Sequence, residues 1–152
     1  MFHVEHGDAV ARVIAVVNQK GGVGKTTTAV NLSAGLALAE RRTVLIDLDP
    51  QGNATTGLGL NKAESRRTVY NVLLDNLPLS EATAATQLPF LGIVPSEMDL
   101  VGAEIELVGT SEREHRLKSA VDAARDQFES IVIDCPPSLG LLTLNALTAA
   151  DS

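Results

Sequence analysis

After a short N-terminal segment the chain reads Arg12-Val-Ile-Ala-Val-Val-Asn-Gln-Lys-Gly-Gly-Val-Gly-Lys-Thr26. Residues 12–17 are mostly apolar and β-branched, which predicts a short buried strand of a parallel sheet. The glycines that follow predict a tight turn, and from Lys25 to about Glu40 apolar residues recur at helical spacing. A strand, a glycine-rich turn and a helix in this order are the setting in which a phosphate-binding loop is expected.

The glycine-rich turn carries the residue types that hold phosphates. Its glycines allow successive backbone N–H groups to face phosphate oxygens, and the following helix adds its positive N-terminal end. Lys25 is predicted to bridge the terminal phosphates, and the Thr26 hydroxyl to ligate magnesium. A turn that binds nothing is the competing interpretation, which the agreement of strand, turn and helix disfavours. The predicted nucleotide-binding residues are Lys20, Gly21, Gly22, Val23, Gly24, Lys25, Thr26 and Thr27.

Lys20 departs from the common phosphate loop, which has no lysine at that position and has glycine in place of Gln19. Within its own loop Lys20 would duplicate the charge of Lys25, but pointing outward it can reach phosphates held by a second copy of the protein. The whole chain has only four lysines and a net charge of −7, yet two of the lysines lie in this loop. This concentration favours an anion site over a solvated charged surface.

Three aspartates follow predicted strands. Asp47 and Asp49 stand at the end of a strand over residues 43–47, and Asp134 ends a strand over residues 131–134. If these strands flank the first strand, the three carboxylates converge near the phosphate loop, where a metal and an attacking water must be held. For one aspartate alone, a turn or helix cap is an equally good interpretation. Cys135 is interpreted as a small buried thiol rather than a nucleophile.

The remaining pattern alternates strands and helices and predicts an α/β fold, a three-layer sandwich with a mainly parallel sheet. Such sheets bind ligands at the carboxyl ends of their strands. A further strand is predicted over residues 90–94, and Ser96 is the expected N-cap of the next helix. Glu112 and Glu114 are expected in the first turn of another. The predicted helices cover residues 25–40, 69–74, 96–108, 111–127 and 139–150, with a turn or helix over 78–85 and a loop with one helical turn over 54–68.

Composition limits the class of protein. The 152 residues are 45% hydrophobic and 20% charged, which excludes a disordered protein. One cysteine excludes a disulfide framework and fits a reducing, cytosolic compartment. The longest apolar runs fall far short of the roughly 18 residues of a membrane span. The acidic balance argues against nucleic-acid binding by bulk charge. One domain is expected over residues 12–152, after a flexible arm over residues 1–11.

Three motifs together resemble the deviant Walker A ATPases of ParA (Soj) type. They are Lys20-Gly-Gly-Val-Gly-Lys-Thr-Thr-Thr28, Asp47-Leu-Asp-Pro-Gln-Gly-Asn53 and Asp134-Cys-Pro-Pro-Ser138. Residues 95–107 and 142–147 resemble further stretches of the same family, so the resemblance covers the chain from Arg12 onward.

The resemblance implies a Mg²⁺-dependent ATPase that dimerises around two ATP molecules. It implies that Lys20 crosses the dimer interface to the partner's nucleotide and that Asp49 positions the attacking water, which makes these two the expected catalytic residues. The expected magnesium residues are Thr26, Asp47 beside the metal shell, and Asp134 as the Walker B carboxylate. The family segregates chromosomes or plasmids with a ParB partner, and its ATP dimer binds DNA without sequence preference. A cytoplasmic protein, nucleoid-associated when full length, is therefore expected.

Two alternatives stay open. The related MinD branch is membrane-associated through a C-terminal amphipathic helix, but the residues after Asp47 and Asp134 favour the partitioning branch, so no membrane partner is expected. Family members also continue past Ser152 into further core strands. The chain is therefore expected to be the N-terminal part of a larger P-loop domain, without its C-terminal strands, its adenine contacts and most of its DNA-binding surface. An inactive truncated product is the other possibility.

Overall fold

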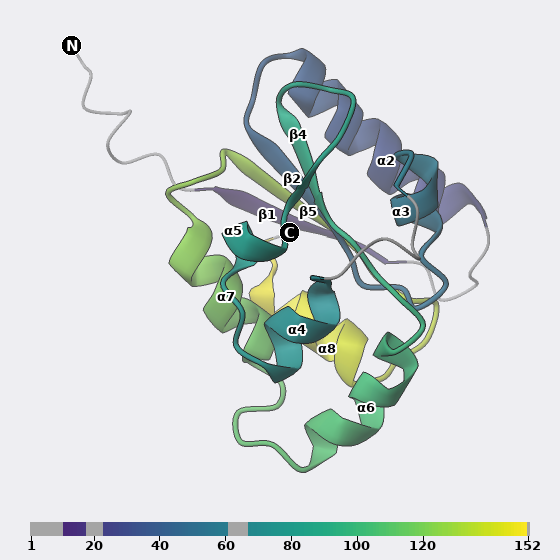
Figure 1. Ribbon diagram of the computed structural model, residues 1–152, viewed down its shortest axis with the longest axis vertical. Helices are drawn as coiled ribbons and strands as arrows, with labels where there is room; N and C mark the ends of the chain where they lie inside the picture. Colours follow the sequence, from purple (N-terminus) through teal and green to yellow (C-terminus); the bar gives the residue numbers. More distant parts are fainter. Residues whose placement is uncertain (1–10, 18–22, 61–66, 152) are drawn as a thin grey trace.

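The computed structural model describes residues 11–17, 23–60 and 67–151, with the side chains of residues 23–25 left undescribed. Five strands form one sheet in the order β1-β5-β2-β4-β3 (Figure 1). The first four of these run parallel to one another, and β3 is antiparallel to β4. The mainly parallel α/β sheet predicted from the sequence is confirmed. The strands are β1 (Arg12–Val16), β2 (Thr43–Asp47), β3 (Ala84–Ala85), β4 (Leu91–Val94) and β5 (Ser130–Asp134).

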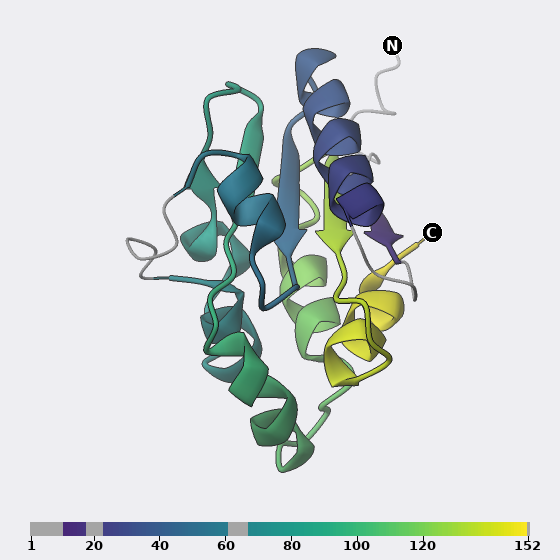
Figure 2. The same ribbon diagram turned by 90° about the vertical axis from the view of Figure 1, so that its right-hand side faces the viewer.

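Helices cover both faces of the sheet (Figures 1 and 2). On one face, α2 and α3 pack against side chains such as Leu45 and Val132. The other helices bury their apolar residues against the opposite face, which includes Ile46 and Ile131. The helices are α2 (Val23–Leu38), α3 (Asn53–Gly57), α4 (Val69–Leu74), α5 (Leu79–Ala82), α6 (Leu100–Val108), α7 (Arg116–Ala124) and α8 (Leu141–Ala149).

The central strands are buried because their apolar, mostly β-branched side chains pack against helices on both faces of the sheet. Every residue of β2 and of β5 is buried, and successive residues alternate between the two cores. Burying a side chain of this size contributes roughly 1.5–3 kcal/mol relative to leaving it exposed. Both strands therefore hold the polar residue at their carboxyl end in a fixed place.

The prediction that Ser96 caps a helix is wrong. The helix α6 begins only at Leu100, and Asp99 precedes it. The Ser96 hydroxyl is instead buried and donates a hydrogen bond of 2.7 Å to the backbone carbonyl of Asp49. This side chain joins the end of β4 to the loop after β2.

The predicted helix over residues 111–127 is also shorter in the structure. It begins at Arg116, so Glu112 and Glu114 precede it. Glu112 has φ = 54°, a left-handed conformation that a helix excludes. Likewise α2 ends at Leu38, two residues before the predicted end, because Glu40 has φ = 63°. The short β3 has no counterpart among the predictions, since two alanines carry no strand pattern.

The condition that strands 43–47 and 131–134 both flank the first strand is met by only one of them. Only β5 lies beside β1, and β2 lies on the far side of β5. This places β2 and β5 side by side in register, so that Asp47 stands opposite Asp134. Two of the three predicted carboxylates therefore lie at neighbouring strand ends.

The first described residue, Ala11, is bound to Arg125 at the end of α7. The buried Ala11 donates its backbone N–H to the carbonyl of Arg125 and accepts a hydrogen bond from the Arg125 guanidinium. Residues 1–10 of the predicted arm lie outside the described residues. Among the described residues, no helix has the length and apolar character needed to cross a membrane.

Candidate functional site

The side chains of Asp47 and Asp134 lie on the same face of the sheet because side chains alternate between the two faces along each strand. Each follows two positions after a residue, Leu45 or Val132, that packs against α2 and α3. Side chains two apart along a strand lie on the same face. Both aspartates are fully buried. The helices α2 and α3 lie on this face (Figure 1), and each contributes a residue that contacts one of the two aspartates.

Thr26 contacts Asp134 directly. Its hydroxyl donates a hydrogen bond of 3.2 Å to Oδ2 of the Asp134 carboxylate. Thr26 is the fourth residue of α2, so this contact lies at the positive end of a 16-residue helix. The structure thus brings together the predicted hydroxyl ligand of the metal and the predicted Walker B carboxylate, which are 108 residues apart in the sequence.

Asp47 makes its contacts to the loop that follows β2. Its Oδ2 accepts hydrogen bonds from the Thr55 backbone N–H at 2.9 Å and from the Thr55 hydroxyl at 2.7 Å. Its Oδ1 accepts one from the Asp49 backbone N–H at 3.1 Å. Burial raises the pKa of Asp47 to about 6, the hydrogen bonds from Thr55 lower it, and the nearby charge of Asp134 adds to the increase. The buried Asp47 carboxylate therefore holds the loop after β2 in place through hydrogen bonds to Asp49 and Thr55. Its role beside magnesium stays a prediction.

Asp49 sits in the turn between β2 and α3. The carboxylate accepts a hydrogen bond of 3.0 Å from the backbone N–H of Gln51, and the side chain is almost fully buried. Gly52, with φ = 68°, supplies the left-handed conformation that lets the chain turn into α3. The position of Asp49 is thus set by the backbone of its own turn.

Two contributors to this site escaped sequence reasoning. Thr55 lies in a stretch interpreted as a loop, and Ser96 was interpreted as a cap. Both are fully buried beside Asp47 and Asp49. Small hydroxyl residues in or next to loops are too common to stand out, and only the strand order shows that residues 55 and 96 meet.

Part of the predicted site lies outside the described residues. This concerns Lys20, Gly21 and Gly22 entirely, and the side chains of Val23 and Lys25. The backbone of residues 23–25 forms the start of α2, as the phosphate-loop prediction requires. Thr27 is exposed next to Thr26. The roles of these residues in binding nucleotide stay predictions.

The donor set suits magnesium rather than a fully protein-bound metal. Within the described ranges, no group of three or more His, Cys, Asp or Glu side chains could hold a metal ion. Mg²⁺ usually binds one or two protein oxygen ligands and completes its shell with water and substrate phosphates. The hydroxyl of Thr26 and the carboxylate of Asp134, at the start of a helix, fit that pattern.

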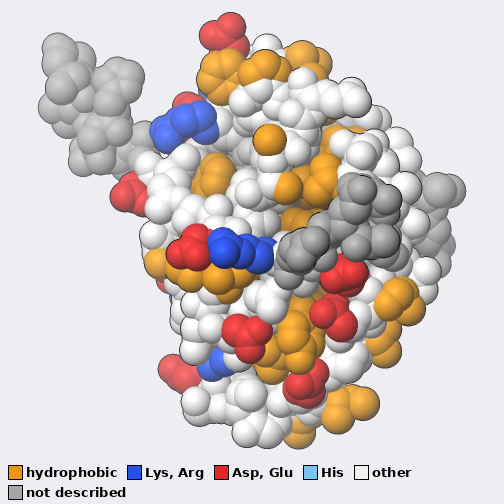
Figure 3. Space-filling view, viewed as in Figure 1, with side chains coloured by type: hydrophobic (Ala, Val, Ile, Leu, Met, Phe, Trp, Pro, Cys, Tyr) orange, Lys and Arg blue, Asp and Glu red, His pale blue; other side chains and the backbone are white. Residues whose placement is uncertain are grey.

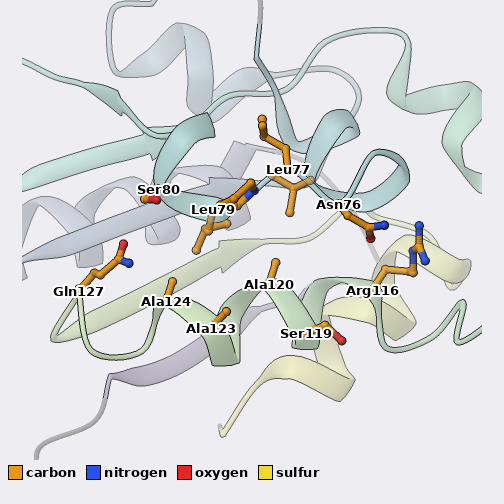
Figure 4. Close-up of a pocket in the computed structure, with 12 residues that line it drawn as sticks. Asn76, Leu77, Leu79, Ser80, Arg116, Ser119, Ala120, Ala123, Ala124 and Gln127 are labelled. Carbon is orange, nitrogen blue, oxygen red and sulfur yellow. The ribbon is translucent and has the colours of Figure 1, made fainter.

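The described residues also line cavities. One of about 220 Å³ is formed between α5 and α7, on the sheet face opposite the two aspartates, with Leu79 and Ala120 in its wall (Figure 4). A smaller one of about 90 Å³ lies close to the site, because Pro136 and Pro137 after β5 line it. Cys135, between Asp134 and these prolines, is buried, as predicted.

Comparison with known proteins gives a consistent family. Residues 11–152 match the model of the AAA_31 family, an AAA domain. The chromosome partitioning protein ParA of Myxococcus xanthus is 56% identical over 143 residues, which cover 94% of this chain and 50% of that protein. The sporulation initiation inhibitor protein Soj of Bacillus subtilis is 54% identical over 143 residues, covering 94% of this chain and 56% of that protein.

A solved structure with the same fold is that of cobyrinic acid a,c-diamide synthase from Mycobacterium smegmatis, with a bound ATP analogue and magnesium. It superposes with a TM-score of 0.88 at 46% identity, and the match covers 93% of this chain and 57% of that chain. The chain spans about half the length of the curated relatives it matches.

Proposed function

The chain belongs to the AAA_31 family of AAA domains, in its ParA (Soj) branch, and from this premise we propose that it is the nucleotide-binding part of a Mg²⁺-dependent ATPase that partitions chromosomes or plasmids. The observation that carries the proposal is the contact between the Thr26 hydroxyl and the Asp134 carboxylate at the start of α2. The ATP analogue and magnesium in the synthase structure support ATP and Mg²⁺ as the cofactors.

The site residues would divide the work as follows. Thr26 and Asp134 hold magnesium, Asp134 through water, and Lys25 lies against the terminal phosphates. Magnesium, when bound, neutralises charge on the phosphates. Asp49 orients the water that attacks the terminal phosphate, and its fixed turn suits that task. Lys20 reaches the nucleotide of a second copy, so that ATP binding and dimerisation are coupled.

The whole protein would work with two macromolecular partners. These are DNA, bound without sequence preference by the ATP dimer, and a ParB-like protein that stimulates hydrolysis. The face shown in Figure 3 carries Asp and Glu side chains over α4 and α6, in keeping with the net charge of −7. An acidic surface repels phosphates, so we assign DNA contact to the rest of the protein. We place that protein in the cytoplasm, at the nucleoid. A membrane-bound MinD-like ATPase or an inactive product remain as alternatives.

A second candidate function comes from the name of the synthase relative, which describes amide formation on cobyrinic acid. That protein is 46% identical, against 56% and 54% for the partitioning ParA and the Soj protein. Partitioning is therefore our proposal. Stimulation of ATP turnover by DNA and a ParB-like protein supports it, whereas turnover that requires cobyrinic acid and an amine donor supports the synthase.

Substitutions in the full-length protein test the proposal. Lys25→Ala and Lys20→Ala should both abolish ATP-dependent dimerisation in size-exclusion chromatography with light scattering. Lys20→Ala should keep ATP binding by the monomer, because its lysine acts across the interface. Asp49→Ala should give a dimer that persists, since ATP is bound but not turned over. Normal dimerisation by Lys20→Ala, or normal turnover by Asp49→Ala, would contradict the assigned roles.

A further inference from the structure

A closed ring of buried hydrogen bonds surrounds the backbone of Asp49. Its members come from the end of β2, from α3 and from the residue pair that follows β4. Four residues take part, and all are buried: Asp47, Asp49, Thr55 and Ser96. Neither of the two hydroxyl residues has a role in the function proposed above.

The ring can be followed bond by bond. The Thr55 hydroxyl donates to Oδ2 of Asp47 at 2.7 Å and accepts the backbone N–H of Ser96 at 3.1 Å. The Ser96 hydroxyl donates to the backbone carbonyl of Asp49 at 2.7 Å. The backbone N–H of Asp49 donates to Oδ1 of Asp47 at 3.1 Å, which closes the ring.

Both ends of the Asp49 residue are therefore held by side chains. Its N–H is bound by Asp47, which the sheet fixes, and its carbonyl is bound by Ser96, which follows a second strand of the same sheet. The Thr55 hydroxyl joins the two anchors. The Asp49 carboxylate itself takes no part in the ring and bonds within its own turn. The ring thus fixes the position of the Asp49 carboxylate through the Asp49 backbone and makes no hydrogen bond to the carboxylate itself.

We propose that Thr55 and Ser96 are positioning residues that hold Asp49 in the place from which it orients the attacking water. The inference rests on the proposed function, in which Asp49 acts in hydrolysis alone. A reaction that depends on a water-orienting group loses rate when that group is misplaced by a fraction of an ångström. Loss of the ring should therefore lower kcat, while ATP binding and dimerisation, which depend on other residues, stay intact.

The test measures ATP turnover by the full-length protein. Ser96→Ala removes one of two hydrogen bonds to the Asp49 carbonyl, the other being from the Gly52 N–H at 2.9 Å, and keeps the Ser96 N–H that Thr55 accepts. A lost hydrogen bond of this kind corresponds to a fall in kcat of about tenfold, and KM for ATP should stay within about twofold. Thr55→Val keeps the shape of the side chain and should cause a similar fall, whereas Thr55→Ser keeps the hydroxyl and should restore most of the rate.

Ser33→Ala is the matched control. Its hydroxyl is also fully buried on the α2 face of the sheet and donates to the Ala29 carbonyl at 2.8 Å, but it has no link to Asp49. It should leave kcat unchanged, with the melting temperature measured for both variants. A fall in kcat with Ser33→Ala as large as with Ser96→Ala would show a merely structural effect and overturn the inference.

A double variant separates positioning from general damage. If Ser96 acts through Asp49, Asp49→Ala/Ser96→Ala should turn over ATP no more slowly than Asp49→Ala alone. Independent, multiplicative losses would overturn the inference, as would unchanged kcat in Ser96→Ala or a loss of dimerisation equal to the loss of kcat. If the wild type does not hydrolyse ATP, the proposed function and this inference both fail. If the wild type hydrolyses ATP and Ser96→Ala does so equally fast, only this inference fails.

Discussion

Replacing Gly140 with alanine tests the contact between Glu104 of α6 and the start of α8. Gly140 precedes α8 with φ = −110° and ψ = −167°, an extended conformation that alanine adopts freely. The difficulty is space, since the added Cβ would overlap the carboxylate of Glu104. That carboxylate, from α6, accepts the backbone N–H of Leu142 at 3.2 Å and so satisfies a free donor in the first turn of α8.

The cost can be worked out from these contacts. The Glu104 side chain is flexible and can swing away, so the loss is its charge-assisted hydrogen bond, about 1.5–3 kcal/mol, rather than a rigid clash. Replacing glycine in an allowed conformation returns about 0.4–1 kcal/mol through the unfolded chain. Gly140→Ala should therefore lower the free energy of unfolding by about 1–2 kcal/mol.

A double-mutant cycle isolates the contact. In the Glu104→Ala background the hydrogen bond is already gone and the space is open, so Gly140→Ala should be neutral or slightly stabilising. The coupling energy between the two sites should be about 2 kcal/mol, measured by urea unfolding followed by far-UV circular dichroism. Equal losses from Gly140→Ala in both backgrounds would refute the reasoning.

Three further predictions concern the sheet and its charges. Ile131→Ala, in the buried centre of β5, should cost about 2–5 kcal/mol of unfolding free energy; a loss in urea denaturation below 1 kcal/mol would contradict the packing of β5. The Arg125 guanidinium lowers the pKa of Asp151, so this pair stabilises the fold above the ordinary pKa of 3.8 and loses its contribution as pH falls through the lower folded value. Asp151→Asn should therefore flatten the loss of stability in urea midpoints taken between pH 5 and pH 2, and an unchanged slope would count against the ion pair. Burial raises the pKa of Asp47 from 3.8 to about 6, so the native state binds more protons between these values and the contribution of Asp47 to stability falls by about 3 kcal/mol as pH rises. Carboxyl-carbon NMR of the nucleotide-free chain should show Asp47 titrating near pH 6, and a midpoint near 4 would contradict its burial.

Local patterns were sufficient to predict four of the five strands and the aspartates that end β2 and β5. The apolar runs before Asp47 and Asp134 need two buried faces, and only the interior of a parallel sheet supplies both. The same patterns assigned Thr26 and Asp134 to one magnesium site, but the contact between the two side chains depends on the pairing of β1 with β5.

Long-range pairing could not be predicted in this way. That β5 separates β1 from β2 depends on packing between segments about 90 to 120 residues apart, for which no local pattern exists. Ser96 shows the consequence. Its sequence context favours a helix cap, but its hydroxyl binds a carbonyl 47 positions away, and only the register of β2 and β4 brings the two together.

In the function proposed above, the start of α2 and the end of β5 form a Mg²⁺·ATP site. Titration of the chain with a fluorescent ATP analogue, with and without Mg²⁺, tests it most directly, with Lys25→Ala and Thr26→Ala as comparison variants and circular dichroism as the control for folding. The account predicts saturable binding that Mg²⁺ strengthens, that Lys25→Ala abolishes, and that loses its Mg²⁺ dependence in Thr26→Ala. A folded wild-type chain that binds no nucleotide would contradict this assignment, and so would a Lys25→Ala variant that binds nucleotide as tightly as the wild type.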